Sequence, residues 1–105
     1  MPEYLKVEVY LPEEFVSPLR DALDREGFLR EGHYAGVMAL LNVTGTWIPL
    51  EGASPYDGEI GKLSNAAEIK AEFRCRSADR ERVEAIIRSV HPYEVPVINF
   101  IPLAD

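Results

Sequence analysis

The sequence predicts an α+β protein of the ferredoxin-like class, with elements in the order βαββαβ, an antiparallel sheet and both helices on one face. Two stretches, 4–11 and 68–76, alternate between apolar and polar residues, as strands buried on one face do. Each is followed by apolar residues at helical spacing. A right-handed crossover from each helix back to the sheet then produces the split βαβ arrangement.

Length and composition favour one globular domain spanning residues 1–105. The chain is 47% apolar, and a chain of this length can form a core without disulfides or a structural metal. Its single cysteine excludes an internal disulfide. No apolar stretch approaches the roughly 18 residues of a membrane span, and the first residues lack the pattern of a signal peptide. We therefore expect a cytoplasmic protein with no membrane partner.

The charge balance argues against nucleic acid as a partner. The net charge is -7 at pH 7, whereas phosphate backbones are bound by clustered lysines and arginines. No Gly-x-Ser-x-Gly motif occurs, and neither histidine has an evident nucleophile partner. We expect a protein that is not an enzyme.

The first strand, 4–11, turns its leucines and valines toward the core. The helix after it is expected to begin between Glu14 and Ser17, so that Pro18 lies in the first turn, where amide hydrogens lack helical partners anyway. Gly27 is expected to end this helix.

A second strand is predicted over about 33–43, and its run 37–41 is apolar on both faces. Such a strand is covered on both sides or pairs with a neighbouring subunit. In the ferredoxin-like sheet the second strand is an edge, where exposed apolar residues promote association. We therefore predict a homo-oligomer.

Residues 44–65 differ in composition, since they hold four of the seven glycines and two of the eight prolines. A structureless segment of this length is unusual in a compact domain and usually has a function or local structure. We expect a large, partly ordered loop between the second and third strands, with a small hairpin formed by 46–48 and 59–60.

The second half repeats the pattern of the first. The third strand is predicted over 68–76, Ser77 is a good N-cap for the next helix, and Pro92 ends that helix. The last strand, about 95–103, contains two prolines. Because proline removes a donor from the ladder, this strand should be an edge.

Three motifs give the chain a resemblance to known families. They are Gly-x-Tyr at 32–34, a glycine- and proline-rich stretch at 45–63, and His-Pro-Tyr-Glu-x-Pro at 91–96. Together they resemble the YqfO domain, which is inserted in larger bacterial Nif-like proteins known as homologues of type-2 GTP cyclohydrolase. The third motif is also similar to the C-terminal motif of CutA, the divalent-cation-tolerance family.

The resemblance implies an assembly and a place for its sites. Both families are similar in fold to PII signalling proteins, which assemble as trimers, contact partners through the long loop and bind ligands in clefts between subunits. We expect a trimer with a small-molecule or protein partner. The flanking domains that hold a dinuclear metal site in the larger proteins are absent here, so no cyclohydrolase activity is implied.

The candidate ligand-binding residues come from the glycine-rich stretch and from the corner after the second helix. They are Gly45, Thr46, Trp47, Lys62 and Tyr93. Glycine amides and Lys62 would suit an anionic small molecule in a cleft between subunits. Alternatively, the glycines serve turns that need positive φ, and Trp47 is a packing anchor.

His91 and Glu94 are the candidate metal ligands. An imidazole and a carboxylate suit a divalent cation, but two ligands are too few unless symmetric copies complete the site. Alternatively, His91 lies at the C-terminal end of the helix, where it suits the negative end of the dipole. The sequence leaves the cofactor unknown, with a divalent metal ion as the one candidate.

Two functions fit these observations best, and a third, an enzyme completed only across subunits, is disfavoured by the lack of a nucleophile–base set. The first is a non-catalytic, PII/CutA-like oligomeric module that binds a small ligand, metal ion or partner protein at clefts between subunits. The second is a divalent-cation-binding protein with a metal-tolerance role like that of CutA. A thermal shift with nucleotides would favour the first, and a shift with metals alone the second.

Overall fold

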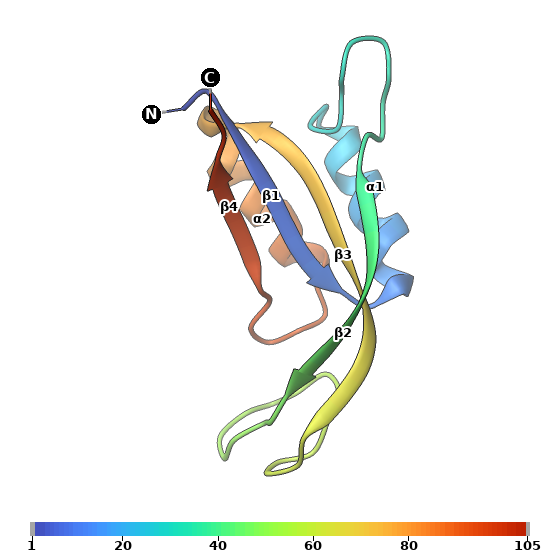
Figure 1. Cartoon of the computed structure of the whole chain (residues 1–105), viewed down its shortest axis with the longest axis vertical. Coiled ribbons are helices and arrows are strands. Elements are labelled where there is room, and N and C mark those ends of the chain that lie inside the picture. Colours follow the sequence, from blue (N-terminus) through green and yellow to red (C-terminus); the bar gives the residue numbers. More distant parts are fainter. Residues whose placement is uncertain (1, 105) are drawn as a thin grey trace.

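The computed structural model describes residues 2–104 and shows a four-stranded antiparallel sheet in the order β2-β3-β1-β4 (Figure 1). Both helices lie on one face of this sheet, so the predicted fold class is confirmed. In chain order the elements are β1 (Tyr4–Leu11), the short helix η1 (Glu13–Phe15), α1 (Val16–Arg25), β2 (Ala39–Trp47), β3 (Ser64–Arg76), the short helix η2 (Ser77–Asp79), α2 (Arg80–Val90) and β4 (Ile98–Pro102).

The core lies between the sheet and the helices. One face of the two central strands, β1 and β3, supplies alternate apolar residues, as the sequence pattern predicts. The helices supply the apolar stripe that faces them. The buried apolar residues are Leu5, Val7, Val9, Leu11, Val16, Leu19, Leu23, Leu29, Ile69, Ala71, Phe73, Cys75, Val83 and Ile87.

Helix α1 begins within the predicted range and carries Pro18 in its first turn. It ends at Arg25, and Gly27, which follows the C-cap residue Glu26, adopts the left-handed conformation with φ of 81°. The Gly27 N–H donates to the Asp24 carbonyl at 2.9 Å, and the Phe28 N–H donates to the Leu23 carbonyl at 3.1 Å. These two bonds are the pair that satisfies the last carbonyls of a helix in a Schellman motif.

Strand β2 starts and ends later than predicted. It begins at Ala39 rather than near residue 33, because Glu31 and Tyr34 form a small turn through mutual backbone hydrogen bonds. The small hairpin predicted inside the loop is wrong. Trp47 belongs to β2 and pairs with Ser64 of β3, so the two strands extend together beyond the part of the sheet that the helices cover (Figure 1).

The prediction that Ser77 is the N-cap is also wrong. Ser77 begins η2, and the N-cap position of α2 is Asp79, which makes no side-chain cap bond. The Ser77 hydroxyl instead donates to the Pro2 carbonyl at 2.5 Å, and its N–H donates to the Glu3 carbonyl at 2.8 Å. Ser77 therefore hydrogen-bonds the segment 2–3 to the end of β3.

Both predicted edge strands, β2 and β4, are edges of the sheet. Helix α2 ends at Val90, before Pro92, as predicted. Strand β4 is shorter than the predicted 95–103, since its pairing with β1 begins only at Ile98. No helix among residues 2–104 is long and apolar enough to cross a membrane.

Candidate ligand site

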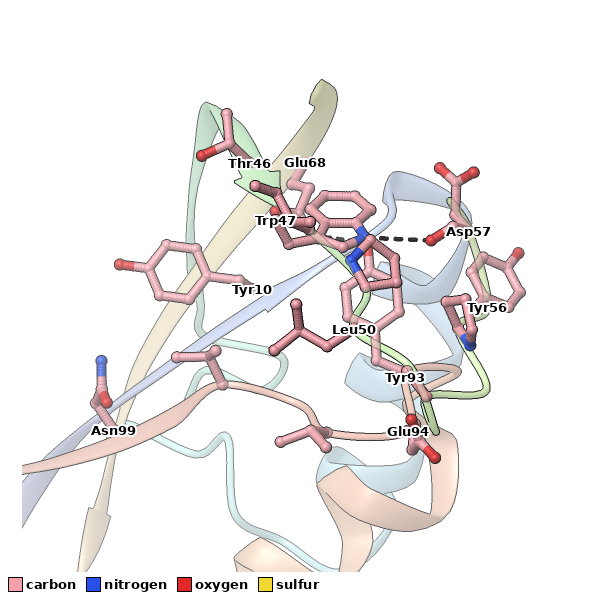
Figure 2. Close-up of a pocket in the computed structure, with 17 residues that line it drawn as sticks. Tyr10, Thr46, Trp47, Leu50, Tyr56, Asp57, Glu68, Tyr93, Glu94 and Asn99 are labelled. Atoms are coloured by element: carbon pink, nitrogen blue, oxygen red, sulfur yellow. Dashed lines mark hydrogen bonds between the residues drawn. The ribbon is translucent and has the colours of Figure 1, made fainter. Parts of the chain in front are cut away.

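A cavity of about 690 Å³ lies where the loop between β2 and β3 meets the segment that enters β4 (Figure 2). Figure 2 shows Trp47, Tyr56 and Tyr93 gathered toward one side of it, with Tyr10 and Asn99 toward the other. Its lining residues are Tyr10, Gly45, Thr46, Trp47, Ile48, Pro49, Leu50, Ala53, Pro55, Tyr56, Asp57, Glu68, Tyr93, Glu94, Val95, Val97 and Asn99.

Hydrogen bonds to backbone carbonyls of the loop hold its conformation over the cavity. The Gly61 N–H donates to the Pro49 carbonyl at 2.7 Å, and the Trp47 Nε1–H donates to the Asp57 carbonyl at 3.1 Å. Gly58, with φ of 112°, adopts a conformation that side chains disfavour, and a Cβ there would lie 2.5 Å from the Ser64 hydroxyl. Gly58 thus serves the turn that lets the loop close over Trp47.

Aromatic rings join the loop to the corner after α2. The Tyr93 ring centroid lies 6.0 Å from that of Trp47 and 5.9 Å from that of Tyr56. The Ser54 N–H of the loop donates to Glu94 Oε1 at 3.1 Å. Two segments about 40 residues apart therefore form one wall of the cavity.

His91, the first residue after α2, is buried and accepts or donates a hydrogen bond at each ring nitrogen. The Tyr93 N–H donates to His91 Nδ1 at 3.2 Å, so the ring proton resides on Nε2, which lies 2.6 Å from the Tyr10 carbonyl and donates to it. Burial lowers the pKa of His91, which keeps the ring neutral. The imidazole thereby ties the end of β1 to Tyr93.

Glu68 of β3 lines the cavity together with Tyr93. The Tyr93 hydroxyl donates to Glu68 Oε2 at 2.7 Å. Burial, followed by this bond, raises the pKa of Tyr93 well above its usual value. A Cβ at Gly45 would overlap Glu68 Oε1. Because position 45 carries no side chain, the Glu68 carboxyl group can lie against the backbone of β2 at Gly45.

The remaining charges on the open face of the sheet neutralise one another. Lys70 Nζ lies 3.1 Å from Glu8 Oε2 and 2.9 Å from Glu72 Oε2, and Lys6 pairs with the same two carboxylates. The Lys70 ammonium holds the pKa of both glutamates below its usual value. This network lies beside the cavity without contributing a cation to its lining.

The free energy of unfolding is expected to fall as the pH drops from about 7 to 5. His91 binds a proton less readily when folded than when unfolded, and an unfolded histidine titrates near pH 6.5. The unfolded state therefore takes up the proton first, and stability decreases with decreasing pH. Chemical denaturation across this range should show the decrease in the wild type and a flatter profile in His91→Gln. The same pH dependence of the free energy of unfolding in both proteins would contradict this expectation.

Four of the five predicted ligand residues, Gly45, Thr46, Trp47 and Tyr93, line the cavity. Lys62 does not, since it lies on the exposed part of the loop, where its Nζ is 2.9 Å from Glu59 Oε2.

The two predicted metal ligands differ in their surroundings. Glu94 lies on the cavity wall, whereas both ring nitrogens of His91 are engaged in the hydrogen bonds described above. No group of three or more His, Cys, Asp or Glu residues suited to a metal ion occurs among residues 2–104. Metal binding by this pair stays a prediction.

Sequence reasoning missed Glu68, Tyr10 and Asn99 as cavity residues. The alternation over 68–76 places Glu68 on the outward, polar face of its strand, yet in the structure it is only 8% exposed. The available signal was Gly45, because a glycine inside a strand indicates close approach by another group. The residue that approaches it depends on the register of β2 and β3, which the sequence did not define.

The fold and the loop that covers this cavity define a CutA-like α+β protein. The family model for the CutA1 divalent ion tolerance protein matches residues 52–105. The chain belongs to the CutA1 family.

Relatives confirm the predicted resemblance to both families. The GTP cyclohydrolase 1 type 2 homolog of Staphylococcus aureus (strain Mu50) is 35% identical over 100 residues, which are 95% of this chain and 27% of that protein. The chain thus spans about a quarter of the length of such relatives. A Bacillus cereus protein related to NIF3 is similar in structure, with a TM-score of 0.83 and 27% identity over 99% of this chain and 26% of its own.

A CutA structure shows the fold without the additional domains. The periplasmic divalent cation tolerance protein CutA from Archaeoglobus fulgidus has a TM-score of 0.72 and 16% identity, over 97% of this chain and 85% of its own. At that identity the likeness concerns the fold alone.

Proposed function

We propose that this chain is a non-catalytic, PII/CutA-like oligomeric module that binds a small ligand in the cavity beneath the β2–β3 loop. One observation carries the proposal, namely the cavity itself. Its volume of about 690 Å³ is in the range of small-molecule sites, roughly 300–1,000 Å³. Such sites combine apolar and aromatic walls with a few fixed polar groups, here the bonded pair of Tyr93 and Glu68.

The surroundings of the cysteine and of the buried histidine support a binding role. Cys75 is buried in the core, and burial raises the pKa of its thiol to about 11. A thiol in that state is not a nucleophile at neutral pH. His91, the buried histidine, is occupied in holding Tyr10 and Tyr93.

Trp47 provides a direct test, because it is the only tryptophan of the chain and it lines the cavity. Nucleotides, amino acids, amines and divalent metal salts would be titrated while its fluorescence is recorded. We expect a saturable change with at least one class, matched by heat in calorimetry. In Trp47→Phe the optical signal is lost while the calorimetric test remains available. No saturable binding by either method would contradict the proposal.

The exposed edge of β2 supports association of copies. Leu40 and Leu41 are 45% and 43% exposed, and β2 pairs with only one strand. Apolar edge strands of this kind associate unless they are charged or covered. A homo-oligomer follows, with a trimer as the stoichiometry expected from the PII-like fold.

Replacement of Leu41 by lysine is expected to convert the oligomer to a monomer at micromolar concentration, because a lysine on an edge strand opposes pairing. Light scattering after size-exclusion chromatography measures the mass. Tyr34→Lys is the matched control, since Tyr34 is 76% exposed but lies outside the sheet. A wild-type monomer, or an unchanged mass for Leu41→Lys, would contradict this mode of association.

Divalent-cation binding is the second candidate function, and the description of the CutA1 family favours it. His91 and Glu94 would be its ligands, but His91 would first have to give up a hydrogen bond to Tyr10 or Tyr93. Calorimetry with zinc and copper, on the wild type and on a His91→Ala, Glu94→Ala double variant, tests this. Unchanged affinity in the double variant would remove these two residues as ligands.

A further inference from the structure

We propose that the cavity selects an organic cation, that is, an ammonium or guanidinium group carried on an apolar or aromatic body. The inference rests on the proposed function, since it names the class of ligand for the same cavity. Three features support it: the sign of the charges in the lining, the lack of an ion pair at buried Glu68 among the described residues, and the aromatic rings beside it.

The lining carries charge of one sign only. Asp57, Glu68 and Glu94 line the cavity, and none of its described lining residues is a lysine, arginine or histidine. The nearest loop cation, Lys62, is paired with Glu59 outside it. A phosphate or carboxylate ligand would therefore meet no positive side chain among these lining residues, whereas a cation would meet side-chain charge of the favourable sign only.

Glu68 is buried without a cation, and comparison with Glu8 shows how unusual this is. Both glutamates are 8% exposed. Glu8 has Lys6 and Lys70 within ion-pair distance. Glu68 has no ion pair within residues 2–104, and its one hydrogen bond, from the Tyr93 hydroxyl, engages Oε2. Buried carboxylates are ordinarily paired, so a cationic ligand would supply the partner that Glu68 lacks.

The aromatic rings suit the same ligand. Trp47, Tyr56 and Tyr93 line the cavity, and the Tyr93 ring centroid lies 6.0 Å from that of Trp47 and 5.9 Å from that of Tyr56. The faces of such rings attract cations, and more strongly where water is excluded from the site. Their apolar surface would also cover the body of an amphipathic amine. A divalent metal ion gains little from apolar and aromatic surface, because it prefers oxygen ligands. It would find few fixed oxygen ligands in this cavity.

Three probes with one phenyl body and different charge test the inference. They are phenethylamine, phenethyl alcohol and phenylpropionate, titrated into the full chain at pH 7.5 by calorimetry and Trp47 fluorescence. We expect the amine to bind at least about tenfold more tightly than the alcohol, since only the amine can form a hydrogen bond to Glu68 in which both groups are charged. The carboxylate should bind most weakly.

Glu68→Gln separates charge from shape. The glutamine oxygen still accepts from the Tyr93 hydroxyl, so the amine should lose about tenfold or more in affinity while the alcohol is unaffected. Glu59→Gln is the matched control, because Glu59 lies outside the cavity, and it should bind all three probes like the wild type. The comparison of probes on the wild type remains decisive if the Glu68 variant does not fold.

The outcomes distinguish this inference from the proposed function. If the alcohol or the carboxylate binds as tightly as the amine, or if Glu68→Gln leaves amine affinity unchanged, the cavity binds a ligand but the selection for cations is overturned. A cationic side chain from a neighbouring copy, already seated on Glu68, would give the first of these results. If no probe binds and no compound of the fluorescence screen binds, both proposals fail.

Discussion

Ile87→Ala is expected to lower the free energy of unfolding by about 2–5 kcal/mol. Ile87 is fully buried on the face of α2 that packs against the sheet, so its truncation loses apolar burial and leaves a cavity. The loss is a large share of the roughly 5–15 kcal/mol that stabilises an ordinary domain. Urea denaturation measures it, with the slope of the transition unchanged.

Arg88→Ala is the control on the next residue of the same helix. Arg88 is exposed, and its ion pair with Glu84 at 3.0 Å is of the kind that contributes less than about 1 kcal/mol. A comparable loss in the two variants would mean that α2 does not cover the sheet as described.

Gly45→Ala is expected to cause the largest effect in the ligand site. A methyl group at position 45 overlaps Glu68 Oε1, so the carboxyl group must move and the bond from the Tyr93 hydroxyl must lengthen or break. We expect a loss of about 1–3 kcal/mol in stability, typical of forcing extra atoms into a packed region. Phenethylamine affinity should fall by tenfold or more, as in Glu68→Gln.

A double-mutant cycle with Glu68→Ala identifies the cause. Once the Glu68 side chain is removed, the methyl group at position 45 meets no obstacle, so the double variant should be more stable than the sum of the two single changes implies. Additive losses would show that the glycine is needed for another reason.

The sequence was most informative where one physical pattern dominated. The alternation over β1 predicted its bounds without error, and the apolar stripes of α1 and α2 placed both helices on the core. Two prolines and an apolar run identified the two edges correctly. These features depend on local periodicity and on proline geometry, which are present in the letters themselves.

The lining of the cavity was predicted only in part, because the cavity is made where distant segments of the chain meet. Gly45, Thr46, Trp47 and Tyr93 were identified from motifs, and they do line the cavity. Glu68 could not be assigned there, since an exposed and a buried glutamate look alike in an alternating strand.

His91 shows the same limit at a single side chain. The sequence placed it correctly at the end of α2. Its hydrogen bonds to Tyr10 and Tyr93 depend on how the corner folds back over β1, which no local pattern states.

A crystal structure of the protein with phenethylamine at saturating concentration tests the central claim most directly. The account predicts the probe inside the cavity, with its nitrogen within hydrogen-bond distance of the Glu68 carboxyl group and its ring against Trp47 or Tyr93. An empty cavity at that concentration, or the probe bound elsewhere on the chain, would contradict it.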